Sequence, residues 1–538
     1  MKVVIIGGVA GGASAAARLR RLDESAEIVI LERGDYISYA NCGLPYYIGG
    51  EITDRRELVL QTPESFSGRF RVDVRLGNEA TAIDPKAKTV SVTRLADGST
   101  YEEPYDKLLL SPGAEPIRPP IDGADDPRVF TLRTIPDTFR IREFIENNLP
   151  KKAVVIGGGY IGVEMAENLA REGIDVSIVE LLPHLIAPLD LDAAADLHRY
   201  VREKGISLFL GEGVSSIERA RTGLTIKTGT HDIPADFAIL SVGVRPESAL
   251  AKTAGIDLGA RGAILTDDHM RTSVADIYAV GDAVEVQNFV SERPGYLPLA
   301  GPANRQGRIA ADNIAGLDSA YKGTQGSAIL KVFDMTVAAT GLSEEAVKAA
   351  GIPYDKVYTY SASHATYYPG ATMMALKLLF RVPDGRVLGA QIVGFDGVDK
   401  RMDVVATAIR LNATVYDLTE LELCYAPPFS SAKDPVNMAG FAAENILSGR
   451  VKQFHWHDVP ALQQRTDVTL LDVRTPAEYE RGHIDGTVHI PLDSLRDSLG
   501  RLDPSKPIYV NCQSGLRSYI ACRILSQNGF DCYNLGGG

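Results

Sequence analysis

The feature that most constrains the fold is a unit of strand, glycine-rich loop and helix that occurs twice in the chain. The first copy begins with the apolar stretch Lys2–Ile6, which predicts a buried parallel strand. The loop Gly7–Gly12 follows, and a helix is expected over residues 13–22. Glycines at such a turn let the backbone approach a pyrophosphate at the N-terminus of the helix. The unit therefore predicts a dinucleotide-binding domain.

The first loop departs in one place from the motif G-x-G-x-x-G. Its three defining positions are Gly7, Val9 and Gly12, so a valine replaces the second glycine. A second strand over residues 27–31 ends in Glu32, 20 residues after Gly12. A carboxylate at that place can accept hydrogen bonds from a ribose diol, which supports the prediction of a dinucleotide site.

The second copy matches the motif at all three positions. Gly157, Gly159 and Gly162 follow a strand expected at residues 153–156, and the next strand ends in Glu180. A carboxylate there suits the free 2′-hydroxyl of NADH and would repel the 2′-phosphate of NADPH. No arginine is nearby in the sequence. An arginine from a distant part of the chain would still allow NADPH to bind. Two such units indicate a flavin and a nicotinamide.

Two further segments fit this organisation. Residues 105–114 predict a strand that leads into a tight turn at Gly113, and residues 277–283 predict a strand that ends at Asp282. With these segments the chain resembles the pyridine nucleotide–disulfide oxidoreductases. The resemblance implies FAD as the flavin, with Gly113 at its site and Asp282 binding the ribityl chain. An alternative role for Asp282 is to cap the N-terminus of a helix after the strand, and the two roles are compatible.

A single cysteine follows the first dinucleotide unit. Cys42 lies within residues 38–46, SYANCGLPY, and no second cysteine follows it in a C-x₄-C pattern. Such a cysteine must take its partner atom from outside, as a mixed disulfide, a persulfide or a sulfenic acid. The segment resembles the single-cysteine branch of the family, which contains coenzyme A disulfide reductases, coenzyme A persulfide reductases, NADH peroxidases and NADH oxidases. The alternative is a buried structural cysteine.

Other motifs discriminate within that branch. Peroxidases and oxidases of the family use a histidine soon after the first loop, and this chain has none before His184. The coenzyme A-using members bring two tyrosines from the dimerisation domain, and the matching motifs place them at Tyr367 and Tyr425. A phenol can donate a proton to a developing thiolate. The resemblance also implies a homodimer in which this domain of one subunit closes the active site of the other. The alternative is that both tyrosines are interface aromatics.

Coenzyme A carries phosphates, which need cationic partners. Arg18 and Arg21 are three residues apart on the first helix and therefore share one face. The resemblance places the coenzyme A phosphates near this helix, and it assigns Ser38 and Asn41 to the same substrate. The alternative is that the two arginines belong to a solvated helix end.

The last 80 or so residues resemble a rhodanese domain. A strand at residues 508–511 leads into Cys512-Gln513-Ser514-Gly515-Leu516-Arg517-Ser518, and a helix is expected over 518–528. Amides of a loop that opens a helix stabilise a thiolate or an anionic persulfide, and Arg517 adds a charge or braces the loop. Gln513 stands where many rhodaneses have arginine, so thiosulfate is expected to be a poor donor. The alternative is a docking domain without activity. Rhodanese domains usually continue past the position of Gly538, so we expect that a closing helix is missing after it.

Composition excludes several classes of function. The net charge of −13 argues against broad binding to nucleic acid or to an anionic membrane surface, although a local basic pocket remains compatible. No apolar run approaches the roughly 20 residues that cross a bilayer. The five cysteines have no metal-ligand spacing, so neither a metal site nor a disulfide framework is expected. We expect a cytoplasmic protein.

The predicted fold class is α/β, with two Rossmann-like domains for FAD and NAD, an α+β dimerisation domain and a C-terminal α/β rhodanese domain. The expected boundaries are 1–150 with 270–326 for FAD, 151–269 for NAD(P)H, 327–446 for dimerisation, 447–457 for a linker and 458–538 for rhodanese.

Cys42 and Cys512, 470 positions apart, together predict an enzyme that reduces sulfur–sulfur bonds. Electrons from NADH would pass through FAD to Cys42, and coenzyme A persulfide or polysulfide would be reduced with release of sulfide. Coenzyme A disulfide is the alternative substrate. A sulfurtransferase or sulfur carrier with a regulatory flavin part is the alternative from another class. NADH oxidase or peroxidase chemistry is disfavoured by the missing histidine.

Overall fold

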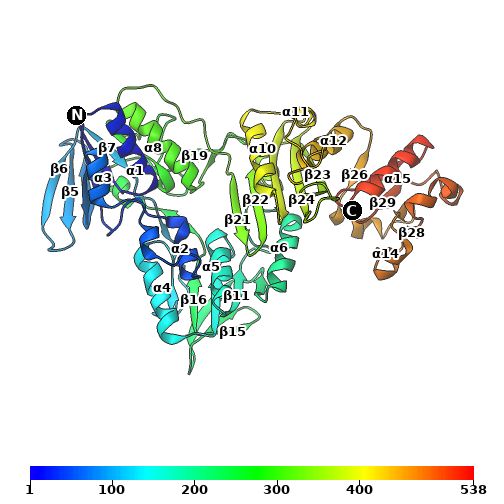
Figure 1. Cartoon of the computed structure of the whole chain (residues 1–538), viewed down its shortest axis with the longest axis horizontal. Coiled ribbons are helices and arrows are strands. Elements are labelled where there is room, and N and C mark those ends of the chain that lie inside the picture. The colour runs from blue at the N-terminus through cyan, green and yellow to red at the C-terminus, as the bar shows by residue number, and fades with distance from the viewer. The chain divides into compact units, whose positions relative to one another are not determined.

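The computed structural model describes residues 1–538 (Figure 1), which form two compact units. The first unit contains residues 1–187 and 198–326, and the second contains residues 188–197 and 327–538. Each unit is described by itself.

A parallel five-stranded sheet begins the first unit, in the order β18-β7-β1-β2-β3. Its central strand β1 (Lys2–Ile6) pairs in parallel with β2 (Glu27–Glu32) and β7 (Lys107–Leu110). The apolar run of β1 is continuous because helices and strands bury both faces of this sheet. The other two strands are β3 (Asp73–Leu76) and β18 (Ile277–Ala279).

Two helices, α1 (Ala10–Leu22) and α8 (Ala300–Ile314), pack side by side on this sheet (Figure 1). Their close approach requires glycine, because a Cβ at Gly307 would lie 2.3 Å from the carbonyl oxygen of Gly11. Residues nearly 300 positions apart in the sequence therefore lie side by side on these two helices.

A second parallel sheet in the same unit has the order β12-β11-β10-β16-β9 and repeats the arrangement of the first. Its helix α5 (Tyr160–Arg171) follows the central strand as α1 follows β1. The strands are β9 (Val129–Phe130), β10 (Lys152–Ile156), β11 (Asp175–Glu180), β12 (Ser207–Leu210) and β16 (Phe237–Leu240). Two antiparallel sheets complete the core of the unit: β4 (Asn78–Asp84), β5 (Thr89–Arg94) and β6 (Thr100–Pro104); and β13 (Val214–Arg219), β14 (Leu224–Thr228) and β15 (Asp232–Ala235).

Further helices and short strands connect these sheets. The helices are α2 (Leu44–Ile48), α3 (Pro63–Phe70), α4 (Ile135–Asn148) and α7 (Ala249–Thr253). The helix α6 (Leu191–Glu203) begins in the segment 188–197 of the second unit and ends in the first. The strands are β8 (Ala114–Pro116), β17 (Val244–Pro246), β19 (Val286–Gln287) and β20 (Pro294–Gly295).

The second unit starts with an antiparallel sheet in the order β21-β22-β25-β24-β23. Two helices, α10 (Val398–Arg410) and α12 (Pro435–Leu447), pack against its strands. The strands are β21 (Ala328–Val332), β22 (Met335–Gly341), β23 (Tyr354–Ala362), β24 (Met373–Arg381) and β25 (Val387–Gly394), and the remaining helices are α9 (Glu344–Ala350) and α11 (Val415–Glu420).

Five buried charges tie residues 188–197 to this sheet. The Lys377 ammonium contacts Asp190 at 2.8 Å, Asp192 at 2.9 Å and Glu344 at 2.9 Å. Lys356 contacts Glu344 at 2.6 Å. Burial of a charge is tolerated only when it is paired in this way, so the cluster specifies how this segment packs within the unit.

The C-terminal sheet is parallel throughout, in the order β26-β30-β29-β27-β28. Its strands are β26 (Lys452–Phe454), β27 (Thr469–Asp472), β28 (Val488–His489), β29 (Ile508–Asn511) and β30 (Cys532–Leu535), and its helices are α13 (Val459–Leu462), α14 (Pro476–Arg481) and α15 (Leu516–Gln527). The strand β26 lies inside the stretch 447–457 that the sequence suggests is a linker. Its three residues are too few to show a strand pattern, and only pairing with β30 makes them a strand.

The predicted fold class is confirmed by these sheets: two parallel dinucleotide-binding folds, an α+β domain and a C-terminal α/β domain. None of the helices combines the length and the apolar character that crossing a membrane requires.

Candidate active site

The two glycine loops have the same internal geometry. A Cβ at Gly12 would lie 1.9 Å from the Gly7 carbonyl oxygen, and a Cβ at Gly162 would lie 2.0 Å from that of Gly157. Only glycine therefore lets each helix start so close to the end of its strand. Gly7 and Gly157 also have φ values of 95° and 106°, in the left-handed region that favours glycine.

Both loops leave the space that a dinucleotide pyrophosphate needs. The N-cap residues of α1 and α5, Val9 and Gly159, make no side-chain capping hydrogen bond, so amides of the first helical turn stay available to an anion. A Cβ at Gly159 would have no atom within 4 Å, so the second loop is an open cradle. The residues present therefore fit FAD at the first loop and NAD(H) at the second.

The acid that ends each second strand faces its own loop. Glu32 Oε2 accepts a hydrogen bond from the Gly8 amide at 2.9 Å, and Glu180 Oε2 accepts one from the Gly158 amide at 2.5 Å. The other oxygen of Glu180 accepts from the Leu182 amide at 2.8 Å. These backbone contacts orient each carboxylate beside its loop, where a ribose diol would lie.

Asp282 lies inside a short 3-10 helix (Gly281–Ala283) whose N-cap is Val280, so the capping alternative for Asp282 is wrong. Its Oδ2 accepts from Arg133 Nη2 at 3.3 Å. Gly113, with φ 81°, adjoins the same guanidinium, since a Cβ there would lie 3.0 Å from Arg133 Nη2. Sequence reasoning missed Arg133, because no motif surrounds it.

Arg133 also contacts the cysteine segment. With the Asn41 amide nitrogen donating to the Arg133 carbonyl at 3.1 Å, the amide oxygen accepts from Arg133 Nη1 at 3.1 Å. A single arginine thus joins Asn41, next to Cys42, to Asp282, the acid predicted to bind the flavin.

Cys42 is an exposed free thiol in a 3-10 turn (Asn41–Gly43) just before α2, so the alternative of a buried structural cysteine is wrong. Close packing around the sulfur raises the pKa of Cys42, and the carboxylates of Glu164 and Asp282 raise it further, whereas Arg133 opposes them. A thiol in this position can act as a nucleophile once its ionisation is assisted.

Glu164, on α5, is a second residue that sequence reasoning missed. Its Oε1 accepts a hydrogen bond from the Tyr46 hydroxyl at 3.1 Å. Burial raises the pKa of Glu164 to about 7; the Tyr46 hydrogen bond opposes this rise and Glu167 adds to it. A carboxyl group that titrates near neutral pH beside a reactive thiol is typical of functional sites.

A cavity of about 380 Å³ lies between α1 and α8. Its polar lining residues are Ser14, Arg18, Arg21, Ser38, Asn304 and Arg308. Arg18 is partly neutralised by Asp312 at 2.7 Å, whereas Arg21 and Arg308 are exposed. Three guanidinium groups and several hydroxyl and amide groups suit a phosphorylated ligand.

The residues that the sequence predicts to bind substrate lie in two different parts of the first unit. Arg18, Arg21 and Ser38 line the cavity, whereas Asn41 lies against Arg133. Arg308 was not predicted, because it comes from α8 and joins the cavity only through the α1–α8 packing. Ser38 has φ 43°, an uncommon conformation for a non-glycine residue that is often found at functional sites.

Tyr367 and Tyr425 meet in the second unit. Their hydroxyl oxygens are 2.8 Å apart, and the hydrogen bond between them raises the pKa of Tyr367. The residues are 74% and 48% exposed, which is unusual for two large aromatic side chains in contact. The motifs that are 58 positions apart in the sequence thus form one exposed phenol pair.

Cys512 lies buried at the end of β29. Its Sγ accepts a hydrogen bond from the Gly515 amide at 3.1 Å and from the Ser518 hydroxyl at 3.3 Å. Both donors favour a thiolate or a persulfide anion at this position. Arg517 donates two hydrogen bonds of 2.7 Å to Glu478, so its guanidinium stabilises the loop that holds Cys512.

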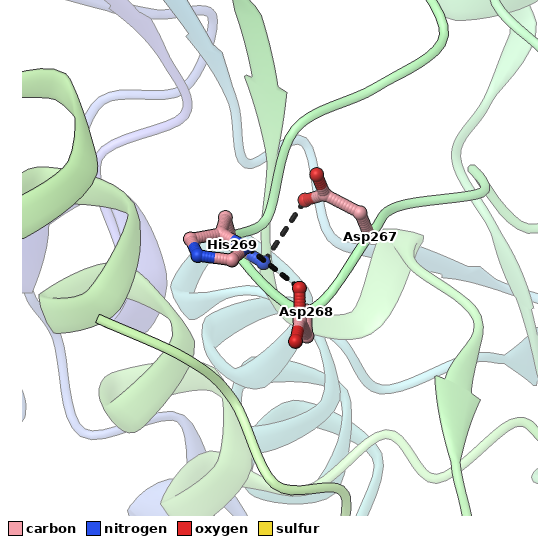
Figure 2. A group of neighbouring side chains, drawn as sticks. All are labelled: Asp267, Asp268 and His269. Carbon is pink, nitrogen blue, oxygen red and sulfur yellow. Dashed lines mark hydrogen bonds and ion pairs between the residues drawn. The ribbon is translucent and has the colours of Figure 1, made fainter. Parts of the chain in front are cut away.

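One group has the residue types of a metal site: Asp267, Asp268 and His269 (Figure 2). The imidazole Nδ1 lies 2.6 Å from Asp268, and Nε2 lies 2.8 Å from Asp318. The hydrogen bonds that the imidazole makes to Asp318 and Asp268 raise the pKa of His269. Both ring nitrogens are engaged by these two carboxylates, and these contacts account for the group without a metal ion.

Two dinucleotide folds that share one unit with an exposed cysteine define a flavin- and nicotinamide-dependent oxidoreductase. Residues 1–307 match the pyridine nucleotide-disulphide oxidoreductases, residues 327–435 match the dimerisation domain of that family, and residues 456–538 match the rhodanese-like domain. The chain belongs to the pyridine nucleotide-disulphide oxidoreductase family, as the resemblance predicted, and FAD and NAD(H) are its expected cofactors.

Known relatives are similar over most or all of the chain. The coenzyme A disulfide reductase of Staphylococcus haemolyticus is 36% identical over 446 residues, 83% of this chain and 100% of the relative. The crystal structure of reduced Bacillus anthracis CoADR-RHD has a TM-score of 0.98 and 50% identity, covering 100% of this chain and 96% of that one. A NAD-dependent persulfide reductase from A. fulgidus has a TM-score of 0.93 and 38% identity, covering 100% and 99%.

Proposed function

We propose that the protein is an NADH-dependent reductase of sulfane sulfur, which cleaves coenzyme A persulfide or a related polysulfide and releases sulfide. The observation that carries this proposal is one exposed cysteine, Cys42, between two dinucleotide folds, in a chain that also holds a persulfide-type loop at Cys512. Similarity to a NAD-dependent persulfide reductase over the whole chain supports it.

The two cofactors would be held by the loops and acids described above. FAD would be held by Gly7, Val9, Gly12, Glu32, Gly113 and Asp282, and NADH by Gly157, Gly159, Gly162 and Glu180. When bound, FAD supplies a two-electron carrier between NADH and the cysteine. Glu180 would favour NADH over NADPH, since a carboxylate beside a phosphate is repulsive.

Cys42 would be the nucleophile. Its thiolate attacks the sulfur attached to coenzyme A, sulfide leaves, and a mixed disulfide with coenzyme A remains on Cys42. Reduction of that disulfide releases coenzyme A and restores the thiolate. Arg133 would orient Asn41 and reduce the electrostatic cost of this thiolate.

The cavity between α1 and α8 would hold the phosphates of coenzyme A through Arg18, Arg21 and Arg308, with Ser38 and Asn41 nearer the thiol end. We also propose a homodimer, in which Tyr367 and Tyr425 of one subunit donate protons at the Cys42 site of the other. Their exposure as a hydrogen-bonded pair supports a role at a surface that another subunit covers.

Cys512 would accept sulfane sulfur from polysulfide or another donor and pass it to coenzyme A. Fusion of the two sites raises their effective concentration to around the mM scale. Arg517 would hold the loop in shape through Glu478. Five free cysteines without a disulfide are consistent with a cytoplasmic location for this chemistry.

A second candidate is coenzyme A disulfide reductase, which the Staphylococcus relative favours by its name and its 36% identity. A relative named NADH oxidase, from Methanocaldococcus jannaschii, is 35% identical over 452 residues. Reduction of oxygen by NADH is therefore a further activity to test. A sulfurtransferase with a regulatory flavin part would retain activity at Cys512 when Cys42 is lost.

The test is anaerobic NADH oxidation with coenzyme A persulfide, coenzyme A disulfide, polysulfide and peroxide. We expect the persulfide to give the highest kcat/KM, and Cys42→Ser to retain FAD while losing nearly all sulfur reduction. Cys424→Ser, which removes another exposed thiol, is the matched control. Turnover of Cys42→Ser near that of Cys424→Ser would refute the proposal, and a preference for the disulfide would select the second candidate.

A further inference from the structure

Glu164 lies at the seam between the cysteine segment and the second dinucleotide fold. It is on the first turns of α5, directly after the loop that ends at Gly162, and α5 packs against α2. Tyr46, which donates to Glu164 at 3.1 Å, is on α2 one helical turn beyond Cys42. Tyr46 thus binds the half-buried carboxyl group of Glu164, and the charge of that carboxyl group acts on the Cys42 thiol.

Three carboxylates influence the Cys42 site, and two of them have cationic partners. Asp282 contacts Arg133 at 3.3 Å, and Glu167 contacts Arg171 at 2.9 Å. The Glu164 carboxylate is hydrogen-bonded only to the neutral Tyr46 hydroxyl and forms no ion pair. Because Glu164 lacks a cationic partner, it is the group that we expect to change its protonation state when the charge on Cys42 changes.

The remaining charges near these helices are also paired. Arg171 also contacts Glu51, and Arg142 contacts Glu146 and Glu172 at 2.7 Å each. These pairs face α2 and α5 from the surface and contribute no free cation to Glu164. A thiolate at Cys42 and a carboxylate at Glu164 would therefore repel each other, and Arg133 is the cation that opposes this effect on the thiol.

We propose that Glu164 carries the proton of the Cys42 site: it takes up a proton when the sulfur–sulfur bond at Cys42 is reduced and returns it to the sulfur that leaves in the next turnover. The inference rests on the proposed function, and it names the residue that balances protons in that reaction. The phenols of the partner subunit donate directly to the leaving sulfur, and Glu164 is the group whose change of charge supplies that proton over the cycle. Glu164 is therefore a positioning and proton-carrying residue rather than the nucleophile.

The two steps balance. In reduction, Cys42–S–S–R, NADH, one proton from solvent and the Glu164 carboxylate give the Cys42 thiolate, RSH, NAD⁺ and the Glu164 carboxylic acid. In attack, the thiolate and R–S–SH form Cys42–S–S–R, and the departing HS⁻ receives the Glu164 proton to give H₂S and the carboxylate. The sum is R–S–SH + NADH + H⁺ → RSH + H₂S + NAD⁺. The site thus never holds both anions.

The reduced holoenzyme tests this inference without reference to any sulfur substrate. Iodoacetamide alkylation of Cys42, measured by peptide mass at a series of pH values, gives the pKa of the thiol. We expect Glu164→Gln to lower that pKa by about one unit, because the repelling charge is lost and the hydrogen-bonding amide is kept. Glu172→Gln, which changes the exposed acid at the C-cap of the same helix, should leave the thiol pKa unchanged. Glu164→Asp should keep most of the wild-type value.

Proton uptake supplies a second readout. Reduction by NADH in weakly buffered solution near pH 7.5 should take up about one proton fewer in Glu164→Gln than in Glu172→Gln. Tyr46→Phe removes a donor that favours the ionised carboxyl, so uptake should persist and its midpoint should move to higher pH.

An unchanged thiol pKa and unchanged uptake in Glu164→Gln would overturn the inference. Failure of the wild-type enzyme to reduce any sulfur donor would overturn the proposed function alone, because the alkylation result does not depend on it.

Discussion

Replacement of Lys377 by methionine should destabilise the sheet of the second unit strongly at neutral pH. The side chain is 2% exposed and its ammonium lies 2.8–2.9 Å from three carboxylates. Methionine keeps the volume of the aliphatic stem but removes the charge. Asp190 and Asp192 would then lose their cation, and Glu344 would keep only Lys356 and the exposed Lys348.

The magnitude follows from the geometry. At an effective dielectric constant of about 20, each contact near 3 Å is worth roughly 5 kcal/mol of Coulomb energy, most of which desolvation cancels. Loss of one partner from a buried pair costs about 3–5 kcal/mol, because an uncompensated charge is left behind. We expect about 4 kcal/mol for Lys377→Met. Lys348→Met is the matched control, because Lys348 contacts the same Glu344 at 3.0 Å but is 61% exposed, and it should cost less than about 1 kcal/mol.

The pH dependence gives the sharper test. Burial would raise the pKa of Glu344, but the hydrogen bond from Lys356 and the charge of Lys377 hold it well below its usual range. A lowered pKa in the folded state stabilises the protein above the unfolded value, near 4.5, and that stability is lost as the pH falls through the folded value. Without Lys377 these carboxyl groups would protonate at higher pH. The difference between wild type and Lys377→Met should therefore be largest near pH 7 and should shrink towards pH 5.

Hydrogen exchange of peptides from β23 and β24, corrected for intrinsic rates, measures the free energy of opening at both pH values. Equal opening free energies for Lys377→Met and Lys348→Met would refute the reasoning. So would a difference from wild type that is the same at pH 7 and pH 5.

Four further outcomes are expected. Cys512→Ser should lose NADH oxidation with polysulfide but keep it with preformed coenzyme A persulfide. An unaffected rate with every donor would exclude the proposed transfer of sulfur from Cys512 to coenzyme A. Stopped-flow of Tyr367→Phe and Tyr425→Phe should show slower reoxidation of reduced enzyme at an unchanged rate of flavin reduction by NADH, and unchanged reoxidation would leave both as packing residues. Glu180→Ala should lower the preference for NADH, measured as kcat/KM with NADH divided by kcat/KM with NADPH, by about tenfold or more. Equal kcat/KM values for the two cofactors in the wild type would mean that Glu180 does not contact the ribose. Arg308→Gln should raise KM for the coenzyme A substrate about tenfold with little change in kcat, since a charged hydrogen bond is worth about 1.5–3 kcal/mol; a KM like that of its exposed neighbour variant Arg305→Gln would remove it from the phosphate site.

Much of the fold could be predicted because its signals are local. The strand, loop and helix around Gly7 and around Gly157 are coded within about 30 residues, and their predicted strands agree with β1 and β10 to within a residue. The loop of Cys512 is equally local, because one strand end and one helix start create it. Longer-range features were reached only by resemblance, as for the meeting of Tyr367 and Tyr425.

The short strand β26 shows where local signals end. Lys452, Gln453 and Phe454 have no periodicity of their own, and they form a strand only because the edge of β30 offers hydrogen bonds. The same holds for the segment that carries Asp190 and Asp192, which belongs by sequence to the second dinucleotide fold but by contact to the second unit.

The sequence by itself determined the fold class, the two dinucleotide loops and the two cysteines that we predict to react with sulfur, because each is specified by residues close together in the chain. The tertiary structure alone decided which charges surround those cysteines. Arg133, Glu164 and Arg308 are ordinary charged residues in the sequence. The fold brings Arg133 to Asn41 and Asp282, Glu164 to α2, and Arg308 to the cavity between α1 and α8. Electrostatic energy depends on distance in space and on burial, and neither quantity can be read from positions along a chain.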